Sequence, residues 1–219
     1  MEIPRVKYMG YDMPERPAFL ENALQGLAYW MGYRSAYFNS YPLPEAAIVT
    51  EACNLIQSNL ASGQVLRPEV MYRKLVKQES SKTQDLTRVD LAILSKAAPD
   101  PYKENNVSDY VQFVIEVKRS SSTEASIDED LRRLYQFKKS CSQDARALLI
   151  LASEAQLPER FVGEAGVSRL YKHDIPNSEG CYHVRRTVKA AHSFKRKEHA
   201  NYVCVVEVFT KPPQKLPKF

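Results

Sequence analysis

The sequence has little glycine and cysteine, and this scarcity excludes several classes of site. Only seven of its 219 residues are glycine, and neither GxxxxGK[ST] nor GxGxxG occurs, so no glycine-rich phosphate-binding loop is expected. The motifs GxSxG and HExxH are also absent. The four cysteines lie far apart without a CxxC pair, which favours free thiols in an intracellular protein, in the cytoplasm or the nucleus.

Long apolar runs are missing as well. No segment approaches the length of a membrane-spanning helix, and the first sixteen residues carry charges from Glu2 to Arg16, so neither a membrane span nor a signal peptide is expected. With 44% hydrophobic and 26% charged residues, the composition is that of an ordinary globular protein. We expect a single domain over residues 1–210 and a flexible Pro- and Lys-rich tail over 211–219.

Histidine is also scarce, and all four histidines follow residue 170, whereas basic residues gather in one place. The net charge is only +5, but residues 185–199 are strongly basic. A stripe of this kind slightly favours contact with a polyanion such as nucleic acid over the alternative, a solvated helix or hairpin face. The candidates for contacts with a nucleic-acid backbone are Arg185, Arg186, Lys195, Arg196 and Lys197.

The spacing of apolar residues predicts an α/β fold. Helices are expected over 17–32, 45–63 and 127–140, with a short one near 157–164, and strands over 66–76, 88–95, 110–118 and 145–152. Two more elements are expected over 181–194 and 202–209. Strands 88–95 and 110–118 should pair across the turn between them, and the helix at 127–140 should make strands 110–118 and 145–152 parallel. The aromatic residues Tyr33, Tyr37 and Phe38 could stack on bases or fill a core, and the core is the favoured expectation.

The strand VQFVIEVKRS, residues 111–120, ends with charged residues in an unusual place. Glu116 and Lys118 are two residues apart and therefore project from the same face of the strand. Asp90 lies in the neighbouring strand and can meet Glu116 across the ladder. Two carboxylates beside a lysine are what a metal-dependent phosphodiesterase needs, because Mg2+ prefers oxygen ligands. The alternatives are a solvated Glu-Lys pair at a strand end and an Asp90 paired with Arg88.

An Asp in one strand, Glu-x-Lys in the next, and a helix on either side resemble the PD-(D/E)XK nuclease superfamily. The resemblance covers residues 43–152 and implies a restriction-endonuclease-like α-β-β-β-α-β core, a mixed sheet flanked by helices, with additions at both termini. Two features depart from the family pattern. Val89 replaces the proline of the motif, and Ser140 stands where members similar to the RecB nucleases carry a tyrosine four residues after Gln136.

The resemblance also implies a set of site residues. Mg2+, which Mn2+ can replace, would lie between Asp90, Glu116 and the main-chain carbonyl of Val117, and Lys118 would orient the attacking water or help to deprotonate it. A glutamate on the preceding helix often completes such sites. Glu51 is expected in that role, with Glu45 as the less favoured choice.

The sequence analysis therefore predicts a Mg2+-dependent nuclease, in particular an endonuclease that acts on DNA. Lys118 could instead serve with Arg119 as a phosphate contact. Two alternatives stay open: an inactive nucleic-acid-binding or assembly module of the same fold, and a nuclease for RNA or branched DNA. A homodimer is expected if both strands of a duplex are cut, because two sites are then needed.

Overall fold

The computed structural model describes residues 5–8, 11–38, 42–77, 87–141, 144–164, 166–169, 171–191 and 200–211. In chain order its elements are β1 (Arg5–Tyr8), β2 (Tyr11–Pro14), α1 (Ala18–Phe38), α2 (Glu45–Asn59), β3 (Gln64–Met71), α3 (Tyr72–Leu75), β4 (Arg88–Ser95), a 3-10 turn (Ser108–Tyr110), β5 (Val111–Arg119), α4 (Glu124–Ser140), β6 (Arg146–Ser153), β7 (His173–Asp174), β8 (Cys181–Ala191) and β9 (Ala200–Phe209). No helix in these ranges is long and apolar enough to cross a membrane.

The main structure is a seven-stranded mixed sheet in the order β3-β4-β5-β6-β9-β8-β7. β4 and β5 pair antiparallel, and β5 and β6 pair parallel, as the sequence predicts. All eight residues of β6 are buried, which explains why its sequence, RALLILAS, is almost continuously apolar. The predicted α/β class with a mixed sheet is confirmed.

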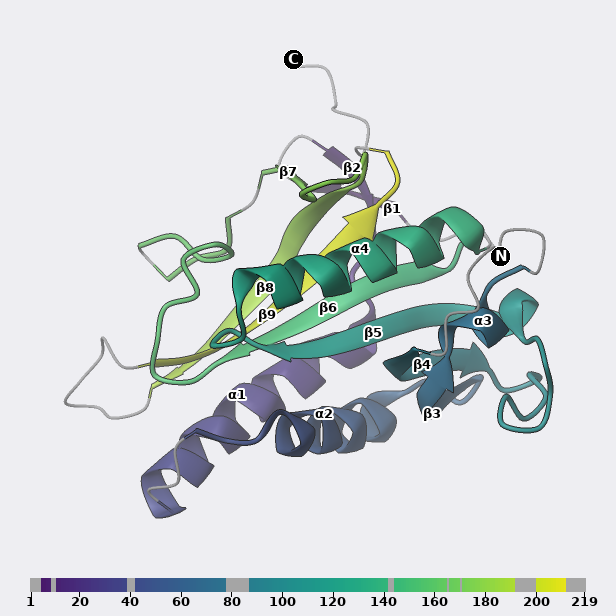
Figure 1. The fold of residues 1–219 in the computed structure, drawn as a ribbon. Coiled ribbons are helices and arrows are strands. Elements are labelled where there is room, and N and C mark those ends of the chain that lie inside the picture. The colour runs from purple at the N-terminus through teal and green to yellow at the C-terminus, as the bar shows by residue number, and fades with distance from the viewer. Residues whose placement is uncertain are drawn as a thin grey trace.

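Helices cover both faces of the sheet, with α4 on one face and α1 and α2 on the other (Figure 1). The alternation of side chains along β5 assigns each residue to one face. Val114 packs with α4, whereas Ile115 and Val117 pack with α1 and α2. Glu116 and Lys118 therefore lie on the face that α4 covers.

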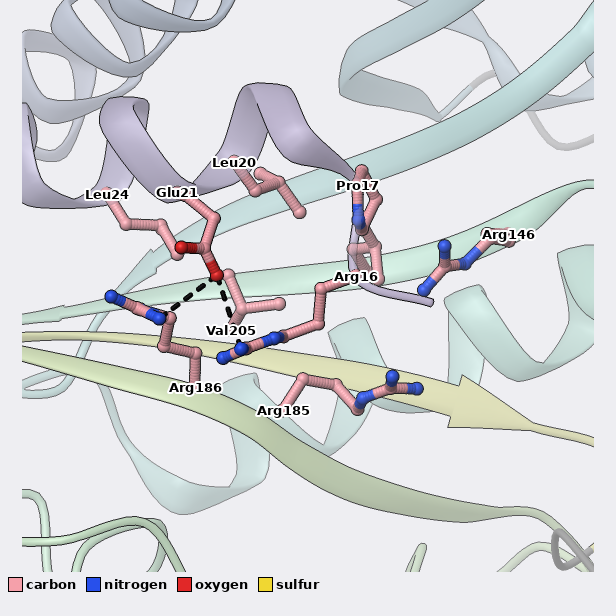
Figure 2. Close-up of a pocket in the computed structure, with 10 residues that line it drawn as sticks. Arg16, Pro17, Leu20, Glu21, Leu24, Arg146, Arg185, Arg186 and Val205 are labelled. Carbon is pink, nitrogen blue, oxygen red and sulfur yellow. Dashed lines mark hydrogen bonds and ion pairs between the residues drawn. The ribbon is translucent and has the colours of Figure 1, made fainter. Parts of the chain in front are cut away.

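Ion pairs fix the start of α1 to the sheet. Glu21, in the first turn of α1, accepts from Arg16 at 3.4 Å and from Arg186 of β8 at 3.0 Å (Figure 2). Beside them the buried Glu207 of β9 holds two further arginines, Arg146 at 2.7 Å and Arg185 at 2.5 Å. The same two arginines donate to the backbone carbonyls of Glu15 and Pro14, so the N-terminal segment is fastened to β6 and β8.

The predicted strand over 66–76 ends earlier, at Met71, and Tyr72–Leu75 form one helical turn. β3 is an outer strand of the sheet, which explains how it accommodates Pro68, a residue without a backbone N–H. The turn at Tyr72 redirects the chain and places the buried tyrosine ring on the sheet face that α4 covers.

Two other predictions are wrong. Residues 157–164 form turns and not a helix: one turn starts at Pro158, and the chain then reverses so that the Gly163 N–H donates to the Val167 carbonyl. α1 continues beyond residue 32 to Phe38, and it exposes Tyr33 and Tyr37 instead of burying them. The side chain of Phe38 lies outside the described residues, as does the tail from 212 onward.

Candidate active site

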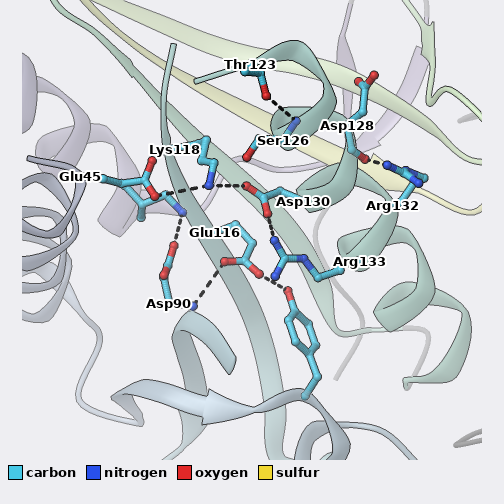
Figure 3. Close-up of polar contacts among 12 residues, drawn as sticks. Glu45, Asp90, Glu116, Lys118, Thr123, Ser126, Asp128, Asp130, Arg132 and Arg133 are labelled. Carbon is cyan, nitrogen blue, oxygen red and sulfur yellow. Dashed lines mark hydrogen bonds and ion pairs between the residues drawn. The ribbon is translucent and has the colours of Figure 1, made fainter. Parts of the chain in front are cut away.

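The antiparallel register of β4 and β5 brings the two strand carboxylates together. Leu91 lies opposite Ile115, and one further step along the ladder leads to Asp90 and Glu116. The Asp90 N–H donates to Glu116 Oε2 at 3.4 Å, and the Val117 N–H donates to Asp90 Oδ2 at 2.7 Å. Figure 3 shows these contacts with Lys118 beside them. The structure thus gathers the three residues that the sequence singles out.

Glu116 is buried, with 4% of its surface exposed. The hydroxyl of Tyr72 donates to its Oε1 at 2.6 Å, so the helical turn α3 supports this carboxyl group directly. Burial, followed by the charge of Asp90, raises the pKa of Glu116 to about 8, and the hydrogen bond from Tyr72 opposes the shift. Near neutral pH this carboxyl group binds a proton unless a cation replaces it.

Burial also raises the pKa of Asp90, against the effect of the hydrogen bond from Val117. The nearby charge of Glu69 adds to the increase. Glu69 has a left-handed backbone with φ of 53°, which is uncommon for a residue other than glycine. A cleft of about 470 Å3 between α2 and the β3–β4 pair opens beside Asp90, and Glu45 and Glu69 also line it.

Lys118 lies between two carboxylates from opposite sides of the sheet. Its Nζ is 3.4 Å from Glu45 Oε1 of α2 and 3.4 Å from Asp130 Oδ2 of α4. Burial alone would lower the pKa of Lys118, but the charges of Asp130 and Glu45 outweigh it and raise the pKa. The ammonium group is therefore charged and held at two points.

Asp130 and Arg133 of α4 belong to this cluster, and the sequence analysis missed both. Asp130 is buried and pairs with Arg133 as well as with Lys118. A signal was present: Asp130 lies three residues after Ile127 and four before Leu134, on the apolar stripe of a predicted helix. A charged residue on such a stripe is rare unless it has a partner in the interior.

The helix glutamate at the site is Glu45 and not Glu51. The two lie six residues apart on α2, which places them about 120° apart around the helix axis on either side of the buried Ile48. Glu45 accepts from Lys118 and, through Oε2, from the Arg119 N–H at 3.3 Å. Glu51 does not line the cleft beside Asp90. The sequence analysis favoured Glu51, whereas the structure brings Glu45 to Lys118.

The predicted nucleic-acid contacts divide into three groups. Arg119 pairs with Glu154 at 3.2 Å, and Arg186 is held by Glu21. Arg185 is 2% exposed because a bulge between Val184 and Arg186 turns it inward onto Glu207, so this residue is not a surface contact. Lys195, Arg196 and Lys197 lie outside the described residues. Gln136, which the sequence analysis compared with the glutamine of the RecB-like nucleases, is exposed on α4.

The donor chemistry of the carboxylate pair fits a divalent cation. Asp90 and Glu116 offer the oxygen ligands that Mg2+ prefers, and both have a raised pKa that a nearby cation would relieve. Among the described residues no three His, Cys, Asp or Glu side chains are arranged to hold a metal. A cation here would therefore complete its shell with water, main-chain oxygen or a phosphate, as Mg2+ commonly does.

Comparison with known proteins leaves the family open. No family model matches the chain, and no curated protein sequence matches it. Among solved structures, NucC of P. aeruginosa ATCC27853 in its cAAA-bound form superposes with a TM-score of 0.38 and 10% sequence identity. The match covers 57% of this chain and 52% of NucC, about half of that protein. A similarity at this level does not establish a shared fold or a shared activity.

Proposed function

We propose that the protein is a Mg2+-dependent nuclease that hydrolyses phosphodiester bonds of DNA as an endonuclease. The observation that carries the proposal is the position of Asp90 and Glu116 on adjacent strands, where the Asp90 N–H donates to Glu116 Oε2, with the Lys118 side chain beside them (Figure 3). A buried carboxylate next to a half-buried one, both with a raised pKa, is typical of functional sites.

The arrangement of elements supports the same reading. Helix α2, strands β3, β4 and β5, helix α4 and strand β6 follow one another, with the short turn α3 inserted between β3 and β4. This is the order expected of a restriction-endonuclease-like core. Glu45 takes the place proposed for the helix glutamate, because it reaches Lys118 and the backbone of Arg119.

Each residue has a separate role in the proposed reaction. Asp90, Glu116 and the Val117 carbonyl would hold the cation, with Mn2+ as a substitute, and the cation would polarise a phosphate and acidify a water. Tyr72 fixes Glu116 through its hydroxyl. The Lys118 ammonium stabilises negative charge that develops on the phosphate oxygens. Attack of water on phosphorus with loss of the 3'-oxygen would leave a 5'-phosphate and a 3'-hydroxyl.

A second candidate is a nucleic-acid-binding or assembly module without activity. It is favoured by the way the charges satisfy one another, because Lys118 is engaged by two carboxylates and Asp90 Oδ2 accepts from the Val117 backbone. In such a module the cluster would be a buried ion-pair network with a structural purpose.

Cleavage of supercoiled plasmid and linear duplex, in Mg2+, Mn2+ or EDTA, tests the proposal. Cleavage should require metal and fall by a factor on the order of 10²–10³ in Asp90→Asn, Glu116→Gln and Lys118→Ala. Glu104→Gln is the matched control, because Glu104 is exposed in the turn between β4 and β5. Its rate should equal that of the wild type.

Metal binding separates the two candidates. Mg2+ should raise the melting temperature of the wild type and of Glu104→Gln, and this increase should disappear in Asp90→Asn. If the wild type binds DNA but cleaves neither duplex, single-stranded nor branched DNA nor RNA, and Mg2+ does not stabilise it, the protein is a binding module.

A further inference from the structure

Asp130 makes contacts that a surface helix residue does not make. Its Oδ2 lies 3.4 Å from Lys118 Nζ, its Oδ1 contacts Arg133, and only 2% of its surface is exposed. α4 packs on the sheet face that carries Glu116 and Lys118, and Asp130 projects from this helix toward the Lys118 ammonium (Figure 3). One carboxylate thus connects α4 to the end of β5.

The position of Asp130 is unfavourable for the fold by itself. It lies between Ile127 and Leu131 on the buried stripe of α4, where an apolar side chain of similar size would pack without desolvating a charge. A buried ion pair is often no more stabilising than an apolar replacement. Pairing with Arg133 alone does not require this position, because an i,i+3 pair forms equally well on a solvent-exposed face.

We propose that Asp130 is a positioning residue, which holds the Lys118 ammonium at the Asp90–Glu116 pair. The inference rests on the proposed nuclease function of that pair. A lysine has a four-carbon chain with free rotation, so its charge is placed accurately only when partners restrain it. Glu45 supplies one partner, but the Glu45 side chain is 38% exposed, whereas that of Asp130 is 4% exposed. Asp130 is thus the more buried of the two partners, and Arg133 holds its second oxygen.

Substitution of Asp130 should lower kcat and leave KM nearly unchanged. Asp130→Asn keeps the shape and removes the charge, and kcat should fall on the order of 10²-fold, since a displacement of about 1 Å at a reacting centre has effects of this size. Asp130→Glu keeps the charge and should give an intermediate kcat. Asp128→Asn is the matched control on the same helix, because Asp128 also pairs with an arginine, Arg160, at 2.6 Å. Its kcat should be that of the wild type.

A double substitution shows whether Asp130 acts through the lysine. In a Lys118→Ala background, Asp130→Asn should cause no further loss of kcat. The proposal is overturned if the losses of kcat in the two single variants add in the double variant, or if Asp130→Asn raises KM and leaves kcat unchanged. A wild-type kcat in Asp130→Asn would do the same. If Asp130→Asn fails to fold by circular dichroism, Asp130→Glu decides through the same two measurements.

A second measurement does not need activity and separates this proposal from the nuclease proposal. In protein labelled with 15N-lysine, the Lys118 ammonium cross-peak is assigned by its loss in Lys118→Arg. The peak should be present in the wild type and in Asp128→Asn and broadened beyond detection in Asp130→Asn. If the wild type cleaves no substrate, the nuclease proposal fails, and this peak still decides whether Asp130 holds the lysine. A peak unchanged in Asp130→Asn refutes the positioning role.

Discussion

At the scale of single residues, the environment of Glu116 raises the pKa of its carboxyl group and so makes stability depend on pH. Its carboxyl group is buried between the charge of Asp90 and the hydroxyl of Tyr72, and its pKa is raised to about 8 from an ordinary value of 4.5. The folded protein therefore binds this proton more tightly than the unfolded chain does. The resulting contribution to stability is fully present below about pH 4.5 and is lost as the pH rises through about 8.

Glu116→Gln should remove this pH dependence. In EDTA, the free energy of unfolding of the wild type should fall relative to that of Glu116→Gln between pH 5 and pH 8, on the order of 1 kcal/mol per pH unit. Urea unfolding at three pH values in this range measures the difference, with Glu104→Gln as the control that keeps the wild-type profile. A difference between Glu116→Gln and wild type that stays constant with pH would contradict the raised pKa.

At the scale of elements, α4 is held by the turn before β8 as well as by the sheet. Gly180 lies against the buried ring of Tyr135 on α4, and a Cβ at this position would be 2.4 Å from Tyr135 Cδ2. The turn that leads into β8 thus packs so closely on the helix that only a residue without a side chain fits. Gly63, which precedes β3, has no atom within 4 Å of the equivalent position.

These two glycines provide a matched pair of substitutions. Gly180→Ala should lower the free energy of unfolding by about 1–3 kcal/mol, because the ring of Tyr135 must shift in a close-packed core. Gly63→Ala should leave it within about 0.5 kcal/mol of the wild type, since the added methyl group meets open space. Denaturant unfolding of both variants gives the comparison. Equal effects in the two would show that Tyr135 yields without cost.

The elements differ in how far the sequence could predict them. β4 and β5 were predicted within one residue, and their pairing followed from short apolar runs separated by a polar turn. The segment 157–164 misled because Leu157 and Phe161 have helical spacing, yet Phe161 reaches the core from a turn. The position of Asp130 on an apolar stripe indicates that it is buried, but its partner Lys118 and the contact of Tyr72 with Glu116 are tertiary contacts with β5, which local spacing does not encode.

At the scale of the whole molecule, one buried carboxylate joins three strands to the N-terminal segment. Glu207 of β9 accepts from Arg146 of β6 and Arg185 of β8, and these arginines also donate to the backbone carbonyls of Glu15 and Pro14. All three side chains are buried. Removal of the carboxylate would leave two guanidinium groups without a buried counter-charge.

Glu207→Gln should therefore destabilise the protein by about 3–5 kcal/mol. Asp174→Asn serves as the control, because Asp174 forms its ion pair with Lys172 in an exposed position and its loss should cost about 0–1 kcal/mol. Thermal and urea unfolding measure both. A loss below about 1 kcal/mol in Glu207→Gln would show that the arginines find other partners or water.

The outer strand β3 limits how this molecule can join another chain. Pro68 offers no backbone donor along that rim, and the left-handed conformation of Glu69 interrupts the extended chain one residue later. A second chain that added a strand to this edge would find no regular row of main-chain hydrogen-bonding groups at these two residues. Main-chain pairing with a second chain is therefore unfavourable at Pro68 and Glu69, the two β3 residues that line the cleft beside Asp90.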